Sequence, residues 1–554
     1  MLGLGQRLED LNIQPINIGG GNMLARACVS AAIAAIVLLA GIGSAAAQKE
    51  GGTLRIYHRD NPPSASVHEE STVSVIQPFM AVFNNLVLFD QNKPLNSPET
   101  IVPDLGSSWS WDESKTKLTF KLREGVKWHD GKPFTAKDVQ CTWHALIGKD
   151  GTEEFRRNPR KVWYYNLKQV TTQGDHEATF HLEHPQPSFL MLLASGFSPV
   201  YPCHVSQGDM RTKPVGTGPF KFVELNRNVS IKLVRNPDYW KQGRPYVDAI
   251  EMRIIDSRST RILGFVSGEF DMTFDSDITV PLMKDMAKQA PKAICELRPS
   301  NVSTNLIINT TAPPFDNPQI RKAMALAIDR QAFIEILTEG KASMGGAMLP
   351  GPEGLWAMPA EELAKLPGYG ADAEQNRTAA RKIMEGLGYG PGKTLKVKVS
   401  TRNIAIYRDP GVILIDQLKA IHIDGVLDPI DTTVWYAKVQ RKDYSVGLNL
   451  TGVGVDDPDV NLIENYTCTS ERNYTQYCNP EIDRLIFQQS KELDLEKRKR
   501  IVWEVERKLA DEVVRPMIFH NRAATCWHPH VKGVVLHQNS IYGNWRLEDV
   551  WLEK

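Results

Sequence analysis

The sequence lacks an excess of either charge. Its 65 Lys and Arg residues balance 65 Asp and Glu residues, so the formal net charge is +0 over 554 residues. Such a chain is not drawn as a whole to nucleic acid or to an anionic membrane, and we expect no nucleic-acid partner. Internal repeats and low-complexity tracts are also missing, and the length suffices for two to four globular domains. A charged ligand therefore has to be recognised by a local site.

The usual signatures of catalysis are absent as well. The sequence contains no G-x-S-x-G elbow, no Walker loop and no H-E-x-x-H motif. One pair, His129 beside Asp130 in "VKWHDGKPFT", has the residue types of an active site. Gly131 and Pro133 follow it, however, and Thr135 is placed to cap a helix that begins after it. We expect this pair to belong to a structural turn, and we expect no enzyme activity, cofactor or metal.

No hydrophobic run reaches the ~20 residues that span a bilayer. The longest, near Val29 to Ala40, follows Arg26 and ends in Ala45-Ala46-Ala47 before Gln48. This order of charge, apolar run and small residues predicts a secretory signal, with residues 1–47 as leader and signal peptide and a mature chain that starts near Gln48. Met1 and Met23 are both candidate start residues. The alternative is an uncleaved anchor helix.

Cysteine is sparse, with seven residues, and no C-x-x-C pair occurs. Cys28 lies within the predicted signal, and the other six can form bridges in an oxidising compartment. Cys468 and Cys478 flank a polar, turn-rich loop, so we predict a disulfide between them worth roughly 2–3 kcal/mol. Two free thiols are the alternative there. The group Cys526, His528 and His530 resembles a metal site, but a single short strand offers too narrow an angular spread to close one.

Strands and helices alternate along the rest of the chain. "LTFKL" from Leu118 to Leu122 has the period of two that is typical of a half-buried strand. In "DNPQIRKAMALAIDR", Asn317 is placed as an N-cap and Pro318 as the first helical residue. "NPEIDRLI" repeats the device with Asn479 and Pro480. Such alternation predicts α/β lobes.

Four segments resemble, in order, the bacterial extracellular solute-binding proteins of family 5, the peptide-, opine- and nickel-type receptors of ABC importers. The segments are "IVPDLGSSWSWDESKTKLTFKLREGVKWHDGKPFTAKDV" (101–139), "PVGTGPFKFVEL" with "VRNPDYW" (214–225 and 234–240), "NTTAPPFDNPQIRKAMALAIDRQAFI" (309–334) and "DDPDVNLIENY" with "YCNPEIDRLI" (456–466 and 477–486).

The resemblance implies a hinged, two-lobe periplasmic binding protein of type II, an α/β fold with an extra domain inserted in the first lobe. Mapping the four segments places lobe I at 51–86, 215–308 and 521–554. The extra domain is expected at 87–214, which includes His129, and lobe II at 309–520. The expected partners are a small-molecule or peptide-like ligand and an inner-membrane ABC permease, with the protein acting as a monomer in the periplasm.

The resemblance also suggests ligand contacts in the cleft between the lobes. Dipeptide-type members hold the ligand's ammonium with an aspartate shortly before a D-P-D segment. Here that position is Gly454, and Asp456 is the nearest substitute. For the ligand's carboxylate the candidates are Arg402 and, less well aligned, Arg408. An aromatic wall is expected from Trp435 and Tyr436, and the early loop offers Asn61, Ser64 and His68.

These residues are compatible with more than one class of ligand. A small polar organic solute, peptide-like or opine-like, is the first expectation. A metal chelate of the nickel type is the second, and it needs His or Met in the cleft. A secreted hydrolase or a chaperone on the same fold is the third, and it needs a nucleophile–base pair or a different surface.

Overall fold

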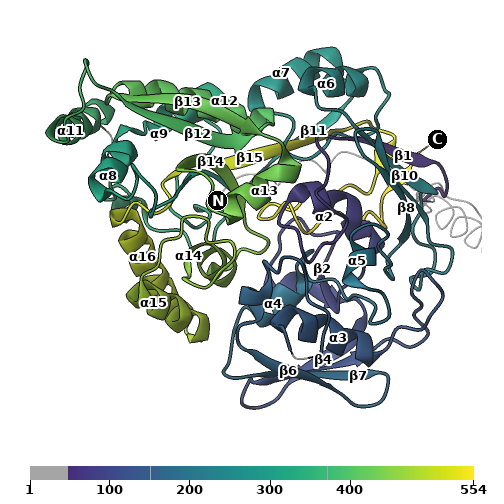
Figure 1. Ribbon diagram of the computed structural model, residues 1–554. Helices are drawn as coiled ribbons and strands as arrows, with labels where there is room; N and C mark the ends of the chain where they lie inside the picture. The colour runs from purple at the N-terminus through teal and green to yellow at the C-terminus, as the bar shows by residue number, and fades with distance from the viewer. Residues whose placement is uncertain (1–47, 150, 371, 554) are drawn as a thin grey trace, which may run out of the picture. The chain divides into compact units, whose positions relative to one another are not determined.

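Five β-sheets organise residues 48–149, 151–370 and 372–553, the part of the chain that the computed structural model describes (Figure 1). The predicted signal peptide and both candidate start residues lie outside the described residues. The chain from Lys49 onward forms one unit, which holds all five sheets. Among the described residues, none of the helices combines the length and hydropathy that a membrane crossing requires.

The first lobe is built on a four-stranded sheet in the order β1-β10-β9-β8. β1 runs parallel to β10, and the other neighbours are antiparallel. The short pair β16–β17 and several short helices complete this lobe, and the short pair β2–β3 lies at the start of the stretch 87–214. The bounds are β1 Thr53–His58, β8 Phe220–Asn226, β9 Ser230–Arg235, β10 Ala249–Ile254, β2 Val87–Phe89, β3 Ile101–Pro103, β16 Val531–Lys532, β17 Trp551–Leu552, α2 Val73–Phe79, α6 Arg258–Val266 and α7 Val280–Gln289.

Residues 87–214 contain an antiparallel sheet of their own, β4-β5-β7-β6, with α3 packed beside it. The predicted strand is β5, in which Leu118, Phe120 and Leu122 are buried, as the period of two requires. Their side chains join one continuous core with those of the first lobe. The bounds are β4 Gly106–Trp111, β5 Lys117–Leu122, β6 Leu167–Thr172, β7 Glu177–Leu182, α3 Ala136–Ile147, α4 Phe189–Ala194 and α5 Gln207–Met210.

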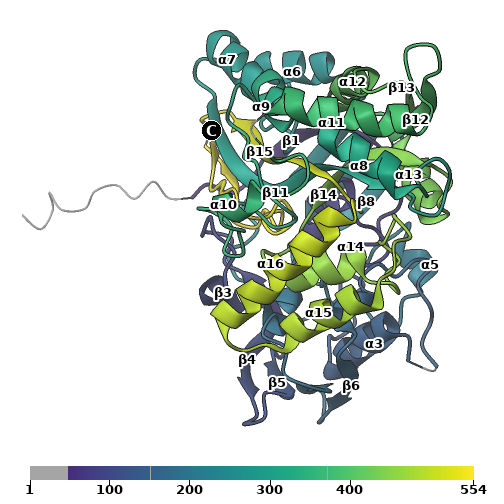
Figure 2. The same ribbon diagram turned by 90° about the vertical axis from the view of Figure 1, so that its left-hand side faces the viewer.

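The second lobe is built on a mixed five-stranded sheet in the order β13-β12-β14-β11-β15. It has a separate apolar core, and Figures 1 and 2 show its helices α8, α11 and α12 at the end of the unit away from β4–β7. The bounds are β11 Ile294–Ile308, β12 Leu395–Arg402, β13 Ile423–Ile430, β14 Val446–Gly452, β15 Met517–Trp527, α8 Pro318–Ala327, α9 Arg330–Thr338, α10 Ala360–Leu363, α11 Ala373–Gly386, α12 Ala405–Lys419, α13 Thr432–Gln440, α14 Glu464–Tyr466, α15 Pro480–Lys491 and α16 Leu495–Asp511.

Side-chain caps begin the helices where the sequence predicts them. The Asn317 carboxamide accepts the backbone N–H of Gln319 at the start of α8, and that of Asn479 accepts the N–H of Glu481 at the start of α15. Thr135 forms a capping box with Asp138 at the start of α3. Local chemistry alone therefore sets these three helix starts.

Two long antiparallel strands, β11 and β15, link the lobes. The start of β11 pairs with the end of β15, from Ile294 opposite Trp527, and their other ends lie in the second-lobe sheet. The register breaks between Pro299 and Ser303, where Asn301 adopts a positive φ of 52°. Trp527 also bridges to Met272 of the first lobe. A second register shift follows between Thr304 and Asn305, so the β11–β15 pairing is interrupted at two places, of which the break from Pro299 to Ser303 is the longer.

Candidate functional site

A small cavity lies where the register of β11 breaks. Its lining comes from the loop after β1, the middle of β11 and of β15, the ends of β12 and β14, and the segments around 436, 472 and 541. The charged residues of the lining are Arg59, Arg402, Arg472 and Arg522; the aromatic residues are Tyr407, Tyr436, Tyr474 and Tyr542; and the small polar residues are Ser71, Thr72, Ser276, Ser300, Asn449 and Asn521.

Arg402, the last residue of β12, is the predicted arginine that lines this cavity. Its guanidinium is almost fully buried and donates to the Asp60 carboxylate over 2.7 Å and to the Tyr407 hydroxyl over 2.8 Å. Two further bonds go to the Thr432 hydroxyl. Although burial alone would raise it, the charge of Arg402 holds the pKa of Asp60 down at about 2. Most of the donors of Arg402 are thus bound within the protein.

The three candidates of the early loop bind other parts of the protein. The Asn61 carboxamide donates to Asn228, the Ser64 hydroxyl donates to Glu70, and the His68 ring contacts the carbonyl oxygen of Pro199. None of the three lines the cavity. Burial lowers the pKa of His68 to about 3, so its ring is neutral at physiological pH. The charged residue of this loop that does line the cavity is Arg59, which directly precedes Asp60.

The remaining candidates, with one exception, also lie away from the lining. Arg408 is exposed and donates to Asn403. Trp435 is fully buried in a small apolar cluster, whereas its neighbour Tyr436 lines the cavity. Asp456 accepts the backbone N–H of Leu355. Burial raises the pKa of Asp456 to about 7. This carboxyl is therefore a poor substitute for the charged aspartate that would bind the ammonium group of a ligand.

Gly454, the position of the expected ammonium anchor, faces aromatic groups. A Cβ at this residue would lie 3.3 Å from the Trp163 ring and 3.5 Å from the Phe197 ring. The Arg160 guanidinium packs against the same Phe197 ring, centred 3.8 Å from its centroid. A buried cation therefore stands near the place where a dipeptide receptor is expected to have an anion.

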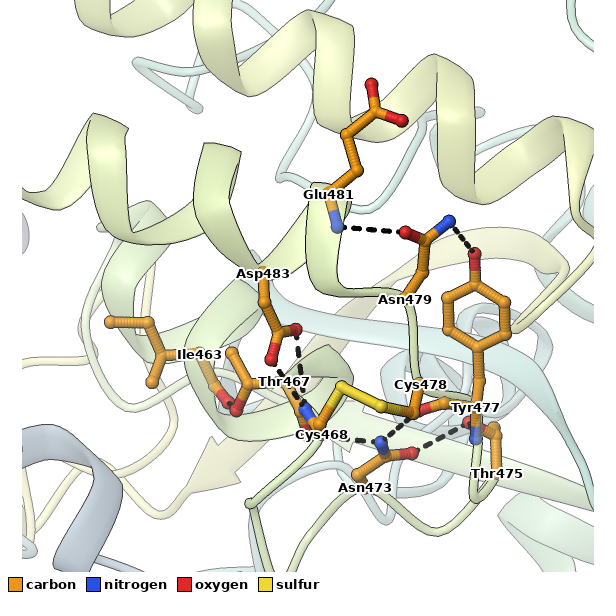
Figure 3. Close-up of a disulfide and its surroundings, with 10 residues drawn as sticks. All are labelled: Ile463, Thr467, Cys468, Asn473, Thr475, Tyr477, Cys478, Asn479, Glu481 and Asp483. Carbon is orange, nitrogen blue, oxygen red and sulfur yellow. Dashed lines mark hydrogen bonds between the residues drawn. A yellow bond between two sulfur atoms is a disulfide. The ribbon is translucent and has the colours of Figure 1, made fainter.

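A disulfide closes the loop that carries Arg472 and Tyr474 into the cavity. The structure joins Cys468 to Cys478, and Figure 3 shows the bridge above the Asn473 side chain. Asn473 donates to the carbonyl oxygens of Thr467 and Tyr477 at the two ends of the loop. The disulfide is predicted from the sequence. No feature of the sequence indicates that the loop it closes lines the cavity.

Two arginines share one carboxylate beside this loop. Arg160 and Arg472 both pair with one carboxylate, that of Glu464. Burial and the charge of Arg472 lower the pKa of Arg160 to about 9. Arg522 pairs with Glu353 over 3.0 Å. No hydrogen bond or ion pair of the Arg59 side chain is found within the described part of the chain, and its guanidinium lies 4.8 Å from the Phe274 ring centroid.

The side chains of the His129–Asp130 pair and of Cys526 form contacts within the protein. The His129 ring contacts the carbonyl oxygen of Gly218 over 3.0 Å, and Asp130 pairs with His204. Burial lowers the pKa of His129 to about 4. Cys526 forms a disulfide with Cys295, while a third bridge joins Cys141 to Cys203. Among residues 48–149, 151–370 and 372–553, no group of three His, Cys, Asp or Glu side chains is arranged to hold a metal ion.

Comparisons with known proteins agree with the two-lobe architecture. The chain is 26% identical over 481 residues to a probable di/tripeptide-binding protein 5 of Pseudomonas aeruginosa, covering 82% of this chain and 87% of that protein. Its fold matches DppA of Helicobacter pylori in complex with the peptide STSA, at 20% identity and a TM-score of 0.79 over 91% of this chain and 99% of that one.

The fold likewise matches AgaA of A. tumefacien R10 in complex with agropinic acid. The identity is 20% and the TM-score 0.78, over 91% of this chain and 99% of that one. Finally, the model of the middle region of the bacterial extracellular solute-binding proteins of family 5 matches residues 100–473, two thirds of the sequence. The chain belongs to family 5 of the bacterial extracellular solute-binding proteins.

Proposed function

We propose that the protein is the substrate-binding component of an ABC importer, which captures a small polar organic solute between its lobes and delivers it to an inner-membrane permease. One observation carries the proposal: a cavity with arginine, tyrosine and amide donors lies between the two separate apolar cores, at the register break of the linking strands. A site in this place changes shape when the lobes move.

The solute class is inferred from the relatives and from the lining together. The names of the relatives and structural neighbours refer to di- and tripeptides, the peptide STSA and agropinic acid. We therefore propose a peptide-like or opine-like solute for this chain. Arg402 forms part of the wall and is itself oriented by Asp60 and Tyr407. The described lining contains neither His nor Met, the residues that a receptor for metal chelates needs, so that alternative is not favoured.

Lobe closure is proposed to occur at the break in β11. With the hinge between Pro299 and Ser303, the boundary expected between 308 and 309 is proposed at about 300 instead. Lobe I then comprises residues 51–86, 215 to about 300 and 521–554, and lobe II comprises about 301–520. Residues 87–214 form the proposed extra domain, which shares the core of lobe I. We further propose that the protein acts as a periplasmic monomer without a cofactor and without enzyme activity. Closure around the solute is the state that the permease recognises.

The test begins with solute released from the purified, full-length mature protein by denaturation and identified by mass spectrometry. The same solute is then titrated calorimetrically into the refolded wild type and into two glycine variants. Gly452 lines the cavity, and a Cβ there would lie 2.1 Å from the Tyr542 hydroxyl oxygen, so Gly452→Leu is expected to obstruct binding. Gly392→Leu is the matched control, because nothing lies within 4 Å of its Cβ position.

Loss of binding in Gly452→Leu alone, with a normal circular dichroism spectrum, supports the proposal. Equal affinity in all three proteins would show that the solute binds elsewhere and would refute the receptor function proposed for this cavity.

A further inference from the structure

We infer that the solute is an organic anion with at least two acidic groups, and that Arg59 and Arg472 are its direct contacts. The inference rests on the proposed function and specifies the substrate class of the same cavity. It requires no ammonium group on the solute, which separates it from the binding of ordinary dipeptides.

The lining itself is the first reason. It presents four guanidinium groups from four different segments, and no Asp or Glu is among the described residues that line it. A buried charge without a counter-charge costs several kcal/mol unless its environment compensates. An anionic solute is the compensation that the lining lacks.

The second reason is that the four arginines differ in how many carboxylate and hydrogen-bond partners they have within the protein. Arg402 has Asp60, and Arg522 has Glu353. Arg59 is 5% exposed and Arg472 is 8% exposed, and the Nε–H group of each is buried without a hydrogen-bond partner among the described residues. Arg472 shares its one carboxylate with Arg160. These two arginines therefore keep both charge and donors for a ligand.

Carboxyl groups near the cavity do not reverse this balance. Asp275, close to Arg59, accepts the Thr525 hydroxyl. Burial raises its pKa to about 6, so it is largely ionised at pH 7 and offsets part of the charge of Arg59 without forming a hydrogen bond to its guanidinium. A neighbouring hollow shares Ser71, Tyr436, Arg472 and Tyr474 with the cavity and adds the acidic residues Glu69, Glu70 and Glu471.

Two of those three acidic residues are held by arginines. Glu69 pairs with Arg211 and Glu70 with Arg157, whereas Glu471 accepts the backbone N–H of Asn158. Glu471 is thus the carboxylate of this hollow that an ammonium group could reach, and a zwitterion and a cation among the test compounds probe that outcome.

The four tyrosines add neutral donors around the cations. Burial raises the pKa of Tyr407 and that of Tyr542 further above the physiological range, so both hydroxyls stay protonated. A phenol hydroxyl donates to carboxylate or sugar oxygens without adding charge. The combination favours acidic conjugates of amino acids with sugars or keto acids over peptides with a free amino terminus.

The experiment is a thermal-shift and calorimetric screen of the full-length mature protein with a charge-sorted panel. The acidic member with two carboxyl groups is N-succinylalanine, the acid with one carboxyl group is agropinic acid, the zwitterion is alanylalanine, and the cation is lysylalanine. We expect N-succinylalanine to stabilise the protein and to bind at least tenfold more tightly than alanylalanine. Its dissociation constant is expected to rise with sodium chloride concentration.

Variants then assign the contacts. Arg59→Gln and Arg472→Gln are each expected to weaken binding of the acidic ligand by roughly tenfold to a hundredfold, the effect of losing a charge-assisted hydrogen bond. Arg408→Gln removes an exposed arginine outside the cavity and is expected to change nothing. If Arg472→Gln does not fold, Arg59→Gln alone decides the assignment.

Failure of the inference and failure of the proposed function give different results. Stabilisation only by alanylalanine or lysylalanine, or unchanged affinity for the acidic ligand in Arg59→Gln, overturns the anion inference and leaves the receptor function standing. If no member of the panel binds and no solute is released from the purified protein, the inference and the proposed function fall together.

Discussion

The guanidinium of Arg402 donates to the carboxylate of Asp60, a residue 342 positions earlier in the chain, over 2.7 Å. Arg402 ends a strand of the second-lobe sheet, and Asp60 follows the first strand of the first-lobe sheet. Both side chains are at least nine-tenths buried. This ion pair therefore fastens the two lobes to each other at the wall of the cavity.

The ion pair predicts a strong energetic coupling between its two residues. Arg402→Met leaves the Asp60 carboxylate buried without its cation, which typically costs about 3–5 kcal/mol. Asp60→Asn should destabilise similarly, while the double variant should recover most of the loss because neither charge remains. Urea unfolding of the four proteins measures the coupling. Additive losses, with a coupling below about 0.5 kcal/mol, would contradict the pairing.

Asp456 predicts a pH dependence of stability. Burial raises its pKa from 3.8 to about 7, so the folded protein binds a proton that the unfolded chain releases above pH 4. Stability should therefore fall as the pH rises from about 4 to about 7, by a few kcal/mol at most since one pKa unit corresponds to about 1.4 kcal/mol.

The Asp456→Asn variant isolates this contribution. Burial also raises the pKa of Glu506 to about 7. The variant therefore keeps the part of the change in unfolding free energy with pH that comes from Glu506. We expect the difference in unfolding free energy between Asp456→Asn and wild type to grow with pH in that window. Asp416→Asn, at an exposed position of α12, is the control. A difference that is constant with pH would show that Asp456 is charged throughout.

The Cys468–Cys478 bridge predicts a link between oxidation and binding. Replacing both residues by alanine removes a loop constraint worth roughly 2–3 kcal/mol. It also releases the segment that brings Arg472 and Tyr474 to the cavity, so affinity for the co-purified solute should fall. Non-reducing peptide mapping should find the two cysteines linked in the wild type.

The bridge Cys141–Cys203 provides the matched control, because neither cysteine lines the cavity. Its double alanine variant should lose stability without losing affinity. Equal affinity in both double variants would mean that the 468–478 loop holds its place without its disulfide.

The N-terminus predicts a processed product. N-terminal sequencing of the exported protein is expected to begin near Gln48, because the small residues Ala45 to Ala47 precede it. Retention of Met23 in the mature chain would instead favour an uncleaved anchor.

Local chemistry accounts for the elements that the sequence predicts well. The period of two in Leu118 to Leu122 and the caps at Thr135, Asn317 and Asn479 depend on neighbours within a few residues. The order of four family segments adds the two-lobe architecture. The structural role of His129 is predicted by the turn residues around it, and the structure places its ring on the Gly218 carbonyl oxygen.

The cavity depends on contacts that no local pattern contains. The sequence alone determined that this is a two-lobe α/β receptor and that Arg402 comes after a strand pattern in the second lobe. Only the tertiary structure decided that Asp60 forms an ion pair with that arginine and that Arg59 and Arg472 line the cavity. It also decided that the side chains of Asp456, Trp435 and His68 are buried away from the cavity. The reason is physical: a side chain's role depends on which charges and donors approach it, and here they come from segments hundreds of residues apart.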